Sequence, residues 1–472
     1  MGSLRIAVIG AGWAGCAAAV ESSLAGHVVT VFEAARQPGG RARSLHRDRH
    51  DWEAGLDNGQ HILLGAYRES LRLMKVVGVD PKKTLLRLPL QIRYPAGTDG
   101  MDFHCTRLPA PLHLLTGLLR TRGLDRADKL ALARFSSAAR WIDWRLNGDR
   151  SVDALLAQFG QTQRVIDLLW RPLCLAALNT PPSRASAQVF LNVLRDSLGA
   201  SRQASDMLLP RRELGQLFPE PALRFVERHN GQVLLGHRVR AIDIHDGRFR
   251  ISDSPGSEHG PKSSSADASS SDPAMALFDR VIVALPAAES AGLLATIETA
   301  IIPDDAQASA SNLGHESITT CYLRYPTDIR LALPVFALRD DPGAGRFGQF
   351  VFDRGQLDAT QRGVLAVVIS ASTHVAAMSA AEVGQSICAQ LAEQFSDERL
   401  RTPMDLRIIS EKRATFSCTP GIVRPSAITG IAGLFRAGDH VAGDYPSTIE
   451  GAVRSGIEAA RLASAGWAQH GA

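Results

Sequence analysis

Residues 4–15 have the sequence Leu-Arg-Ile-Ala-Val-Ile-Gly-Ala-Gly-Trp-Ala-Gly, in which an apolar run leads directly into three closely spaced glycines. The run predicts a buried parallel strand over residues 4–9, and the Ala-rich segment after it predicts a helix over residues 14–25. A second apolar run, Val28-Val-Thr-Val-Phe-Glu33, predicts the next strand. Together these elements form a βαβ unit of the kind that binds dinucleotides.

Each glycine of this unit has a distinct physical use. Gly10 permits the tight turn, Gly12 lets the backbone approach a pyrophosphate, and Gly15 allows close packing of helix on strand. The positive end of the helix dipole attracts the phosphates. Glu33, at the end of the second strand, accepts hydrogen bonds from ribose hydroxyls and would repel a 2′-phosphate. NADP is therefore disfavoured. The residues predicted to hold the nucleotide here are Gly10, Gly12, Trp13, Ala14, Gly15 and Glu33.

A second glycine-rich stretch follows the acid, Gly39-Gly-Arg-Ala-Arg-Ser44. Its glycines bring backbone next to the cofactor, and Arg41 after Gly40 can offset pyrophosphate charge. The stretch resembles the second fingerprint of flavin amine oxidases and carotenoid desaturases. Next to the βαβ unit, this resemblance favours FAD over NAD.

The stretch Asp57-Asn-Gly-Gln-His61 surrounds a glycine with polar side chains. Such a segment is suited to passing beside a flavin ring, which predicts contacts from Gly59 and Gln60. His61 titrates near neutrality and is a candidate acid beside the isoalloxazine. The alternative is that His61 starts a helix and bonds only to backbone; both interpretations stand at this point.

The C-terminal part of the chain has a third cofactor signal. A predicted strand ends at Gly438-Asp439, and a helix rich in small residues follows from Thr448 and Ile449. Asp439 can bond a ribityl chain, and the helix N-terminus favours negative charge at the pyrimidine end of a flavin. These residues resemble the closing motif of the same superfamily, in which Val239 matches the backbone contact to adenine.

With these motifs in order, the whole chain resembles the flavin amine oxidase and phytoene desaturase superfamily. The segments 57–70, 169–181 and 206–211 are similar to a narrower family, the hydroxysqualene dehydroxylases of bacterial hopanoid synthesis. That resemblance implies that reduced FAD converts a C30 isoprenoid, hydroxysqualene, to squalene. It also implies two upstream synthase-like enzymes that make the alcohol from farnesyl diphosphate.

The implied reaction needs an acid, because protonation of an allylic hydroxyl lets it leave as water and gives a delocalised cation. His61 is the first candidate for that acid, and Asp57 and Arg171 are the others.

Three alternative functions stay open. These are a carotenoid desaturase, an amine oxidase and a non-catalytic flavin- or lipid-binding protein; an amine oxidase would need an aromatic cage, for which the region before the last helix offers only Tyr445.

The predicted fold class is α/β, with an FAD-binding Rossmann-like domain of the GR2 type and an interleaved α+β substrate domain that contains a helical subdomain. Residues 1–84, 206–300 and 416–472 are assigned to the cofactor domain, 85–205 to helical and 301–415 to sheet parts of the substrate domain. Apolar spacing also predicts a helix over 62–79. Residues 252–273 are mainly Ser, Asp, Pro and Gly, which predicts a disordered, dispensable insertion.

Composition argues against several other classes of protein. The 472 residues have a net charge of +4 and 21% charged residues, which argues against a nucleic-acid binder. The six cysteines lack metal-ligand spacing, so we expect buried thiols and no metal. No apolar run has transmembrane length, and we expect a cytoplasmic protein. Residues 108–122 mix leucines with arginines, which suits either peripheral contact with the inner membrane face or a buried helix, and both interpretations stay open. No motif indicates the electron donor.

Overall fold

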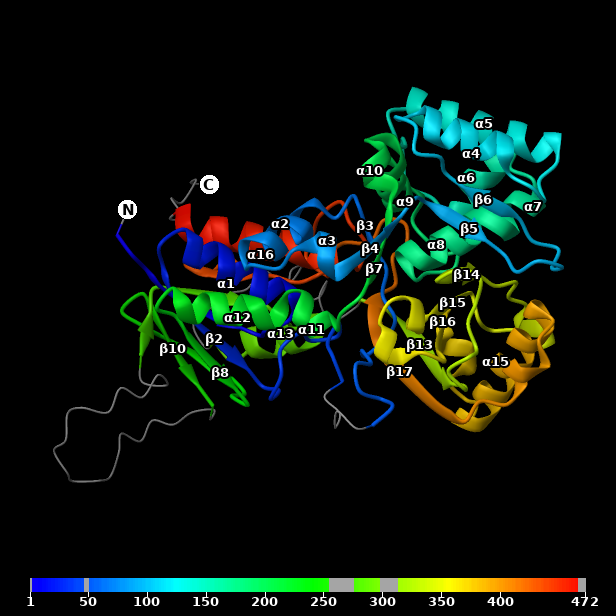
Figure 1. Ribbon diagram of the computed structural model, residues 1–472. Coiled ribbons are helices and arrows are strands. Elements are labelled where there is room, and N and C mark those ends of the chain that lie inside the picture. The colour runs from blue at the N-terminus through cyan, green and yellow to red at the C-terminus, as the bar shows by residue number, and fades with distance from the viewer. Residues whose placement is uncertain (1, 46–50, 254–275, 298–312, 466–472) are drawn as a thin grey trace.

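A five-stranded parallel sheet forms the first half of the architecture (Figure 1). The computed structural model describes residues 2–45, 51–253, 276–297 and 313–465. The sheet has the order β18-β12-β1-β2-β8, and every neighbouring pair is parallel. Its strands come from distant parts of the chain: β1 (Arg5–Ile9), β2 (Val28–Glu33), β8 (Gln232–Leu235), β12 (Arg280–Val283) and β18 (Leu434–Arg436).

Both faces of this sheet are apolar, because successive strand residues point to opposite sides. Helices cover one of the two faces. Ile6 and Val8 of β1 point into a core shared with helices α1 and α16, whereas Ala7 and Ile9 point into a core on the opposite face. The helices on the first face are α1 (Trp13–Leu24), α2 (Arg68–Val76), α11 (Leu214–Leu217), α12 (Pro219–Arg228) and α16 (Ile449–Ala465). The second face holds β9 (Ala241–His245), β10 (Arg248–Ser252), β11 (Leu277–Phe278) and α13 (Ala287–Leu294).

An antiparallel sheet organises the second half, in the order β14-β15-β16-β13-β17. One face packs on helix α15 (Ala380–Phe395) and the other on a helical layer. The strands are β13 (His315–Arg324), β14 (Val335–Ala337), β15 (Phe350–Asp353), β16 (Val364–Ser370) and β17 (Asp405–Phe416). The helical layer contains α4 (Leu112–Arg120), α5 (Arg126–Trp141), α6 (Val152–Gln158), α7 (Gln163–Val165), α8 (Arg171–Leu178), α9 (Ala187–Leu194) and α10 (Arg202–Ser205).

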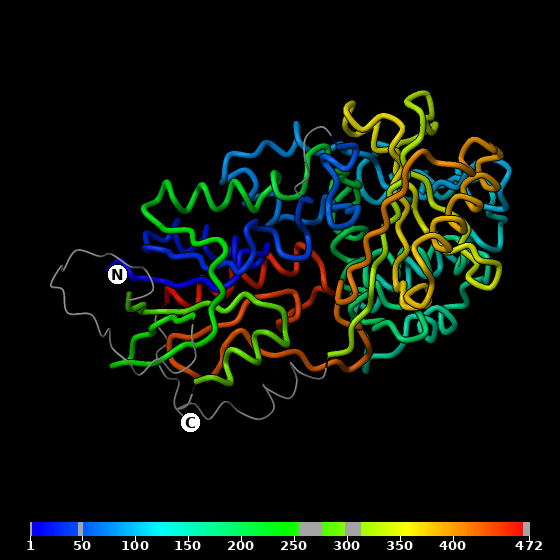
Figure 2. Tube along the Cα trace, turned by 90° about the horizontal axis from the view of Figure 1, so that it is seen from below, coloured from blue at the N-terminus to red at the C-terminus, as the bar shows by residue number. Residues whose placement is uncertain are grey.

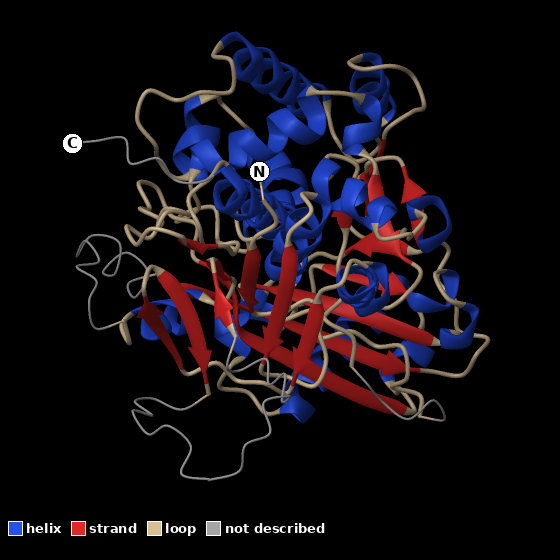
Figure 3. Ribbon diagram, turned by 90° about the vertical axis from the view of Figure 1, so that its left-hand side faces the viewer, coloured by secondary structure: helices blue, strands red, loops and turns tan. Residues whose placement is uncertain are grey.

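The figures show how the two halves interleave along the chain. In Figure 2 the red C-terminal segment runs among the blue N-terminal strands, while cyan, yellow and orange segments fill the other half. Seen end-on in Figure 3, helices gather above the sheets. The predicted fold class is confirmed, because a parallel Rossmann-like sheet and an α+β half with its own helical layer alternate along one chain. The exact division into five segments stays a prediction.

Most predicted elements are confirmed, but the helix over 62–79 is wrong in its first third. Helix α2 begins at Arg68, because Leu63 and Leu64 (β3) pair with Leu208 and Met207 of β7 (Met207–Pro210). The tertiary pairing outweighs the helical spacing of these leucines. Short strands β4 (Leu85–Leu88), β5 (Gln91–Arg93) and β6 (Asp102–His104), with helix α3 (Pro81–Thr84), occupy the region that follows.

The insertion, the cysteines and the absence of a membrane-spanning helix were also predicted. Of the predicted insertion at 252–273, residues 254–273 lie outside the described residues; the strands that flank them, β10 and β11, pair antiparallel. All six cysteines are buried free thiols. In the described part of the chain, no helix combines the length and the hydropathy that crossing a membrane requires.

Candidate functional site

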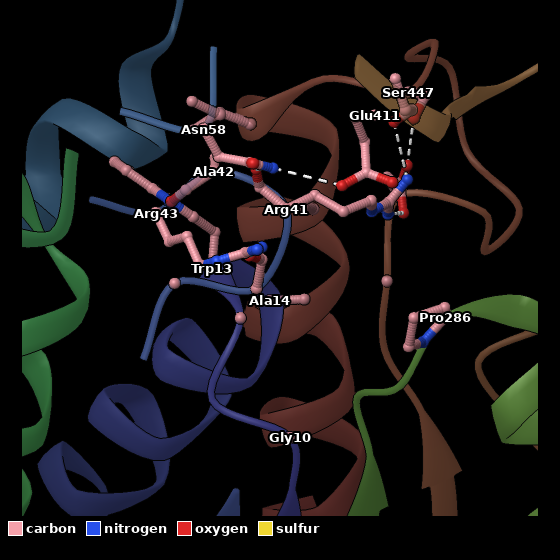
Figure 4. Close-up of a pocket in the computed structure, with 18 of the residues that line it drawn as sticks. Gly10, Trp13, Ala14, Arg41, Ala42, Arg43, Asn58, Pro286, Glu411 and Ser447 are labelled. Atoms are coloured by element: carbon pink, nitrogen blue, oxygen red, sulfur yellow. Dashed lines mark hydrogen bonds and ion pairs between the residues drawn. The ribbon is translucent and has the colours of Figure 1, made fainter. Parts of the chain in front are cut away.

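One large cavity runs between the parallel sheet and the antiparallel sheet, with a volume of ≈ 1110 Å³. That is the size expected of a site for a large cofactor or ligand. Its walls come from the first βαβ unit, the loop 58–62, helices α8, α13 and α16, and strands β13, β15, β16 and β17. Segments from both ends of the chain therefore share one cavity, part of which is drawn in Figure 4.

The glycine turn after β1 lies in the floor of this cavity. Gly10 has φ +102°, where an L side chain would be strained, and a Cβ there would approach the Ala284 carbonyl oxygen to 2.6 Å. Gly12 and Gly39 form a parallel bridge, so the segments 10–15 and 39–40 lie against each other. We call these two segments the glycine strips. The Trp13 indole nitrogen donates to the Ala42 carbonyl at 2.9 Å and fixes this contact.

Of the predicted residues in this turn, Gly10, Gly12, Trp13 and Ala14 line the cavity. Gly15 does not; a Cβ there would lie 1.9 Å from the Gly10 carbonyl oxygen. Its role in the structure is the close packing of the helix on the turn.

The acid at the end of β2 lies at one end of the cavity. The Glu33 carboxylate accepts hydrogen bonds from the backbone N–H groups of Ala11 at 2.7 Å and Ala35 at 2.8 Å. Val239 lines the same region, since β8 pairs beside β2 and the chain turns back there. This end therefore presents a fixed carboxylate with Val239 nearby, which suits a ribose and its base.

Arg41 and Asp439, predicted from motifs nearly 400 residues apart, form an ion pair beside the glycine strips. Arg41 also donates to the Ala414 carbonyl at 2.8 Å, and Ser447 donates to Asp439. Burial would raise the pKa of Asp439, yet the Arg41 guanidinium and the Ser447 hydroxyl hold it at about 2. The carboxylate is therefore charged at any physiological pH. Gly40, Gly438, Thr448 and Ile449 line the cavity around the pair.

Asn58 and Glu411 belong to the site although neither was predicted (Figure 4). The Asn58 amide donates to the Glu411 carboxylate at 3.2 Å and to the Arg41 carbonyl at 3.1 Å. Asn58 belongs to the motif Asp57-Asn-Gly-Gln-His61, so the sequence had a signal for it. Glu411 lies within the long strand β17, where it has no motif of its own.

His61 lies in a loop that lines the cavity, next to Gly59 and Gln60. It does not start a helix. Its Nδ1 hydrogen-bonds the Gly59 carbonyl at 2.8 Å, which leaves Nε2 for a bound molecule. Burial lowers the pKa of the imidazole, and the hydrogen bond to Gly59 only partly opposes this shift. The ring is therefore neutral at pH 7, with Nδ1 as the protonated nitrogen.

The other two candidate acids lie outside the cavity lining. The buried Asp57 carboxylate accepts from the Leu214 N–H at 2.8 Å, and burial raises its pKa to about 7 against the opposing effect of Arg354. Arg171 forms an ion pair with Asp340 at 2.6 Å. Tyr445, the aromatic considered for an amine cage, bonds to Asp196 and does not line the cavity. Of the three candidate acids, only His61 is placed to touch a molecule in the cavity.

The part of the cavity beyond the loop 58–62 is mainly apolar. Helix α8 and the antiparallel sheet supply its walls: Ile62, Leu175, Ala176, Ala177, Ile318, Phe350, Phe352 and Val368. Three polar side chains lie among them, those of Asn179, Ser370 and Thr415. Asn179 is itself held in place, donating to Thr415 at 3.0 Å and accepting from the Ala371 N–H at 2.7 Å.

The polar part of the cavity, from Glu33 to loop 58–62, fits FAD. The two glycine strips leave room where a Cβ would collide, the Glu33 end suits a ribose, and the charged Asp439 can accept from a ribityl hydroxyl. Loop 58–62 separates this polar part from the apolar part. A cofactor ring at that junction would face an apolar substrate on its other side, an arrangement suited to redox chemistry on a lipid.

The chain matches the sequence profile of the family described as flavin containing amine oxidoreductase over residues 13–464. It is 30% identical to a hydroxysqualene dehydroxylase from Sinorhizobium fredii, with 97% of this chain and 98% of that protein covered. A hydroxysqualene dehydroxylase from Zymomonas mobilis is 27% identical over the same share of each chain. A 15-cis-phytoene desaturase from Synechococcus elongatus is 23% identical, covering 96% and 94%.

Solved structures have the same fold. Cyclohexylamine oxidase from Brevibacterium oxydans superimposes with a TM-score of 0.66 at 17% identity, covering 98% of this chain and 99% of that one. Putrescine oxidase bound to putrescine has a TM-score of 0.60 at 16% identity, covering 97% and 98%. At these identities the likeness concerns the fold alone.

Proposed function

Since this chain belongs to the flavin containing amine oxidoreductase family, we propose that it is an FAD-dependent hydroxysqualene dehydroxylase. The observation that carries the proposal is the continuity of the cavity from the glycine strips and Asp439 to the apolar walls of α8 and the antiparallel sheet. Full-length similarity to proteins named hydroxysqualene dehydroxylase supports the same substrate.

The substrate would be a C30 allylic alcohol and the product the corresponding hydrocarbon and water. When bound and reduced, FAD supplies the hydride for such a reduction. Gly10, Gly12 and Gly40 would approach its pyrophosphate, Glu33 its ribose, and Asp439 its ribityl chain. The apolar walls would hold the isoprenoid and keep bulk water from the reacting carbon.

His61 is the proposed proton donor to the leaving hydroxyl. Its Nδ1–H is held by Gly59, so Nε2 is the atom that would carry the transferred proton. Burial makes the imidazolium a stronger acid than a free histidine, because it lowers the pKa. Proton transfer from Nε2–H of the imidazolium to the leaving hydroxyl would therefore be favourable.

The cytoplasmic, peripheral location and the upstream synthase-like enzymes belong to the proposal as well. A C30 alcohol dissolves poorly in water, so the enzyme would draw it from a membrane surface. An unidentified reductant would return FAD to its reduced state after each turnover.

The test is a comparison of both redox directions in one preparation. Purified enzyme with photoreduced flavin is mixed anaerobically with hydroxysqualene, and oxidised enzyme is mixed with phytoene. We expect squalene in the first reaction and unchanged phytoene in the second. Desaturated phytoene without squalene would favour a carotenoid desaturase, and amine oxidation in a parallel assay would favour an amine oxidase.

A further inference from the structure

The outermost layer of the helical subdomain exposes large apolar side chains that nothing in the described part of the chain covers. Helices α4 and α5 lie at the edge of the molecule in Figure 1. Four leucines there are 48% to 65% exposed and one tryptophan is 90% exposed. We call this the α4–α5 face, defined by Leu112, Leu115, Leu119, Leu130 and Trp141.

These side chains follow the helical period, so they form faces and not scattered positions. Leu112, Leu115 and Leu119 are spaced three and four residues apart on α4, while Leu114 and Leu118 pack into the core. On α5, Leu130 and Trp141 are eleven residues apart, which is three helical turns and returns to the same side. Helix α4 therefore has one buried and one exposed apolar side, and α5 adds two large apolar side chains on its exposed side.

The two helices run antiparallel beside each other. The Lys129 ammonium at the start of α5 donates to the Leu119 carbonyl near the end of α4, at 3.0 Å. His113 near the start of α4 lies within electrostatic reach of Arg140 at the end of α5. The exposed Leu119 and Leu130 therefore lie at one end of the pair, and Leu112 and Trp141 at the other.

The same segment concentrates positive charge. Between Arg107 and Arg145 the sequence has eight Lys and Arg but three Asp, an excess of five, although the whole chain has an excess of only four. Asp128 is buried in the capping box of α5. Five exposed guanidinium groups form no ion pair in the described part of the chain: Arg120, Arg122, Arg126, Arg134 and Arg140.

We infer that the α4–α5 face docks on the surface of an anionic lipid bilayer. The exposed leucines and the tryptophan would insert into the interface between headgroups and acyl chains. The arginines around them, which form no ion pair among the described residues, would attract anionic headgroups. Neither helix can cross a bilayer, so contact is confined to one leaflet. The inference rests on the proposed function for its purpose, since an apolar substrate would enter from that leaflet, but its test needs no substrate.

The test measures binding of the FAD-loaded full chain to two kinds of vesicle, phosphatidylcholine alone and phosphatidylcholine with phosphatidylglycerol. We expect cosedimentation with the anionic vesicles, loss of at least tenfold in the double variant Leu115→Glu/Leu119→Glu, and a several-fold loss in Arg122→Gln/Arg126→Gln. The matched control is Met404→Glu/Val423→Glu, which changes two exposed apolar residues elsewhere and should bind like wild type.

Intrinsic fluorescence gives a second readout that does not depend on a charged variant. Trp141 is the most exposed tryptophan in the described part of the chain, because Trp13 and Trp170 are buried and Trp52 and Trp144 are half-buried. Tryptophan emission should therefore shift to shorter wavelength on adding anionic vesicles, and Trp141→Phe should abolish the shift. Equal vesicle binding by wild type and Leu115→Glu/Leu119→Glu, without a Trp141 shift, would overturn the inference. So would a dimer in sedimentation that this variant dissociates, because the face would then bind a second copy. Retained squalene formation in detergent would show that the proposed function survives either failure.

Discussion

His61 is the residue whose surroundings most directly predict a pH dependence. Burial lowers the pKa of its imidazole, so the protonated ring that donates to the substrate becomes more abundant as pH falls from 8 towards that lowered pKa. If proton donation limits the rate, kcat should rise over this interval. In His61→Gln, which can still hydrogen-bond Gly59, this rise should disappear and kcat should fall about 10²-fold or more. A pH profile of kcat that is unchanged in the variant would remove His61 from this role.

The Arg41–Asp439 pair predicts a coupled effect on cofactor affinity. Because Asp439 is charged and Arg41 neutralises it, Asp439→Asn should weaken FAD binding by roughly 1.5–3 kcal/mol, or about ten- to hundredfold in Kd. Arg41→Met should weaken it as well. If the pair acts as a unit, the double variant should lose less than the sum of the two single losses. Fluorescence titration of the apoprotein with FAD measures all four constants, and additive losses would contradict the coupling.

At the scale of elements, the approach of α1 and α16 depends on glycine. A Cβ at Gly456 would lie 2.1 Å from the Ala14 carbonyl oxygen, which is backbone and cannot turn aside. Gly456→Ala should therefore lower the free energy of unfolding by about 1–3 kcal/mol. Gly443→Ala is the control, because a Cβ there meets nothing within 4 Å. Urea unfolding of both variants measures the effect; equal midpoints would mean that the helices separate at little cost.

Elements also show how far sequence alone could predict this molecule. The βαβ unit is local, so its strands and helix could be placed from periodicity and glycine spacing within one or two residues. The strand at Leu63–Leu64 could not, because its partner lies about 145 residues away at Met207–Leu208. Glu411 was missed for a related reason. Its place in the cavity depends on how the long strand β17 lies against the loop 58–62, which no local motif records.

At the scale of the whole molecule, Arg354 joins the two halves. Its buried guanidinium follows β15 of the antiparallel sheet and donates to the Gln60 side chain at 2.6 Å and the Gly55 carbonyl at 2.9 Å, both in the loop that reaches the cavity. Gln361 accepts a further hydrogen bond. Arg354→Met would leave these acceptors unsatisfied and should cost about 3 kcal/mol.

Thermal unfolding of the FAD-loaded protein measures the effect of Arg354→Met, with Arg362→Met at an exposed neighbour as the control. The visible absorbance of bound FAD should also change, since Gln60 and its loop would lose their support. A wild-type melting temperature and spectrum would mean that the two halves are held together elsewhere.

The most direct test of the proposed function is the stoichiometry of a single turnover. Enzyme whose FAD has been fully reduced is mixed anaerobically with excess hydroxysqualene, without a further reductant, and flavin absorbance and squalene are followed together. Reductive removal of one hydroxyl requires two electrons, so the proposed reaction predicts one squalene for each FAD that is reoxidised, at matching rates. Flavin that stays reduced while hydroxysqualene is unchanged would contradict the proposal, as would squalene formed equally by the enzyme with oxidised FAD.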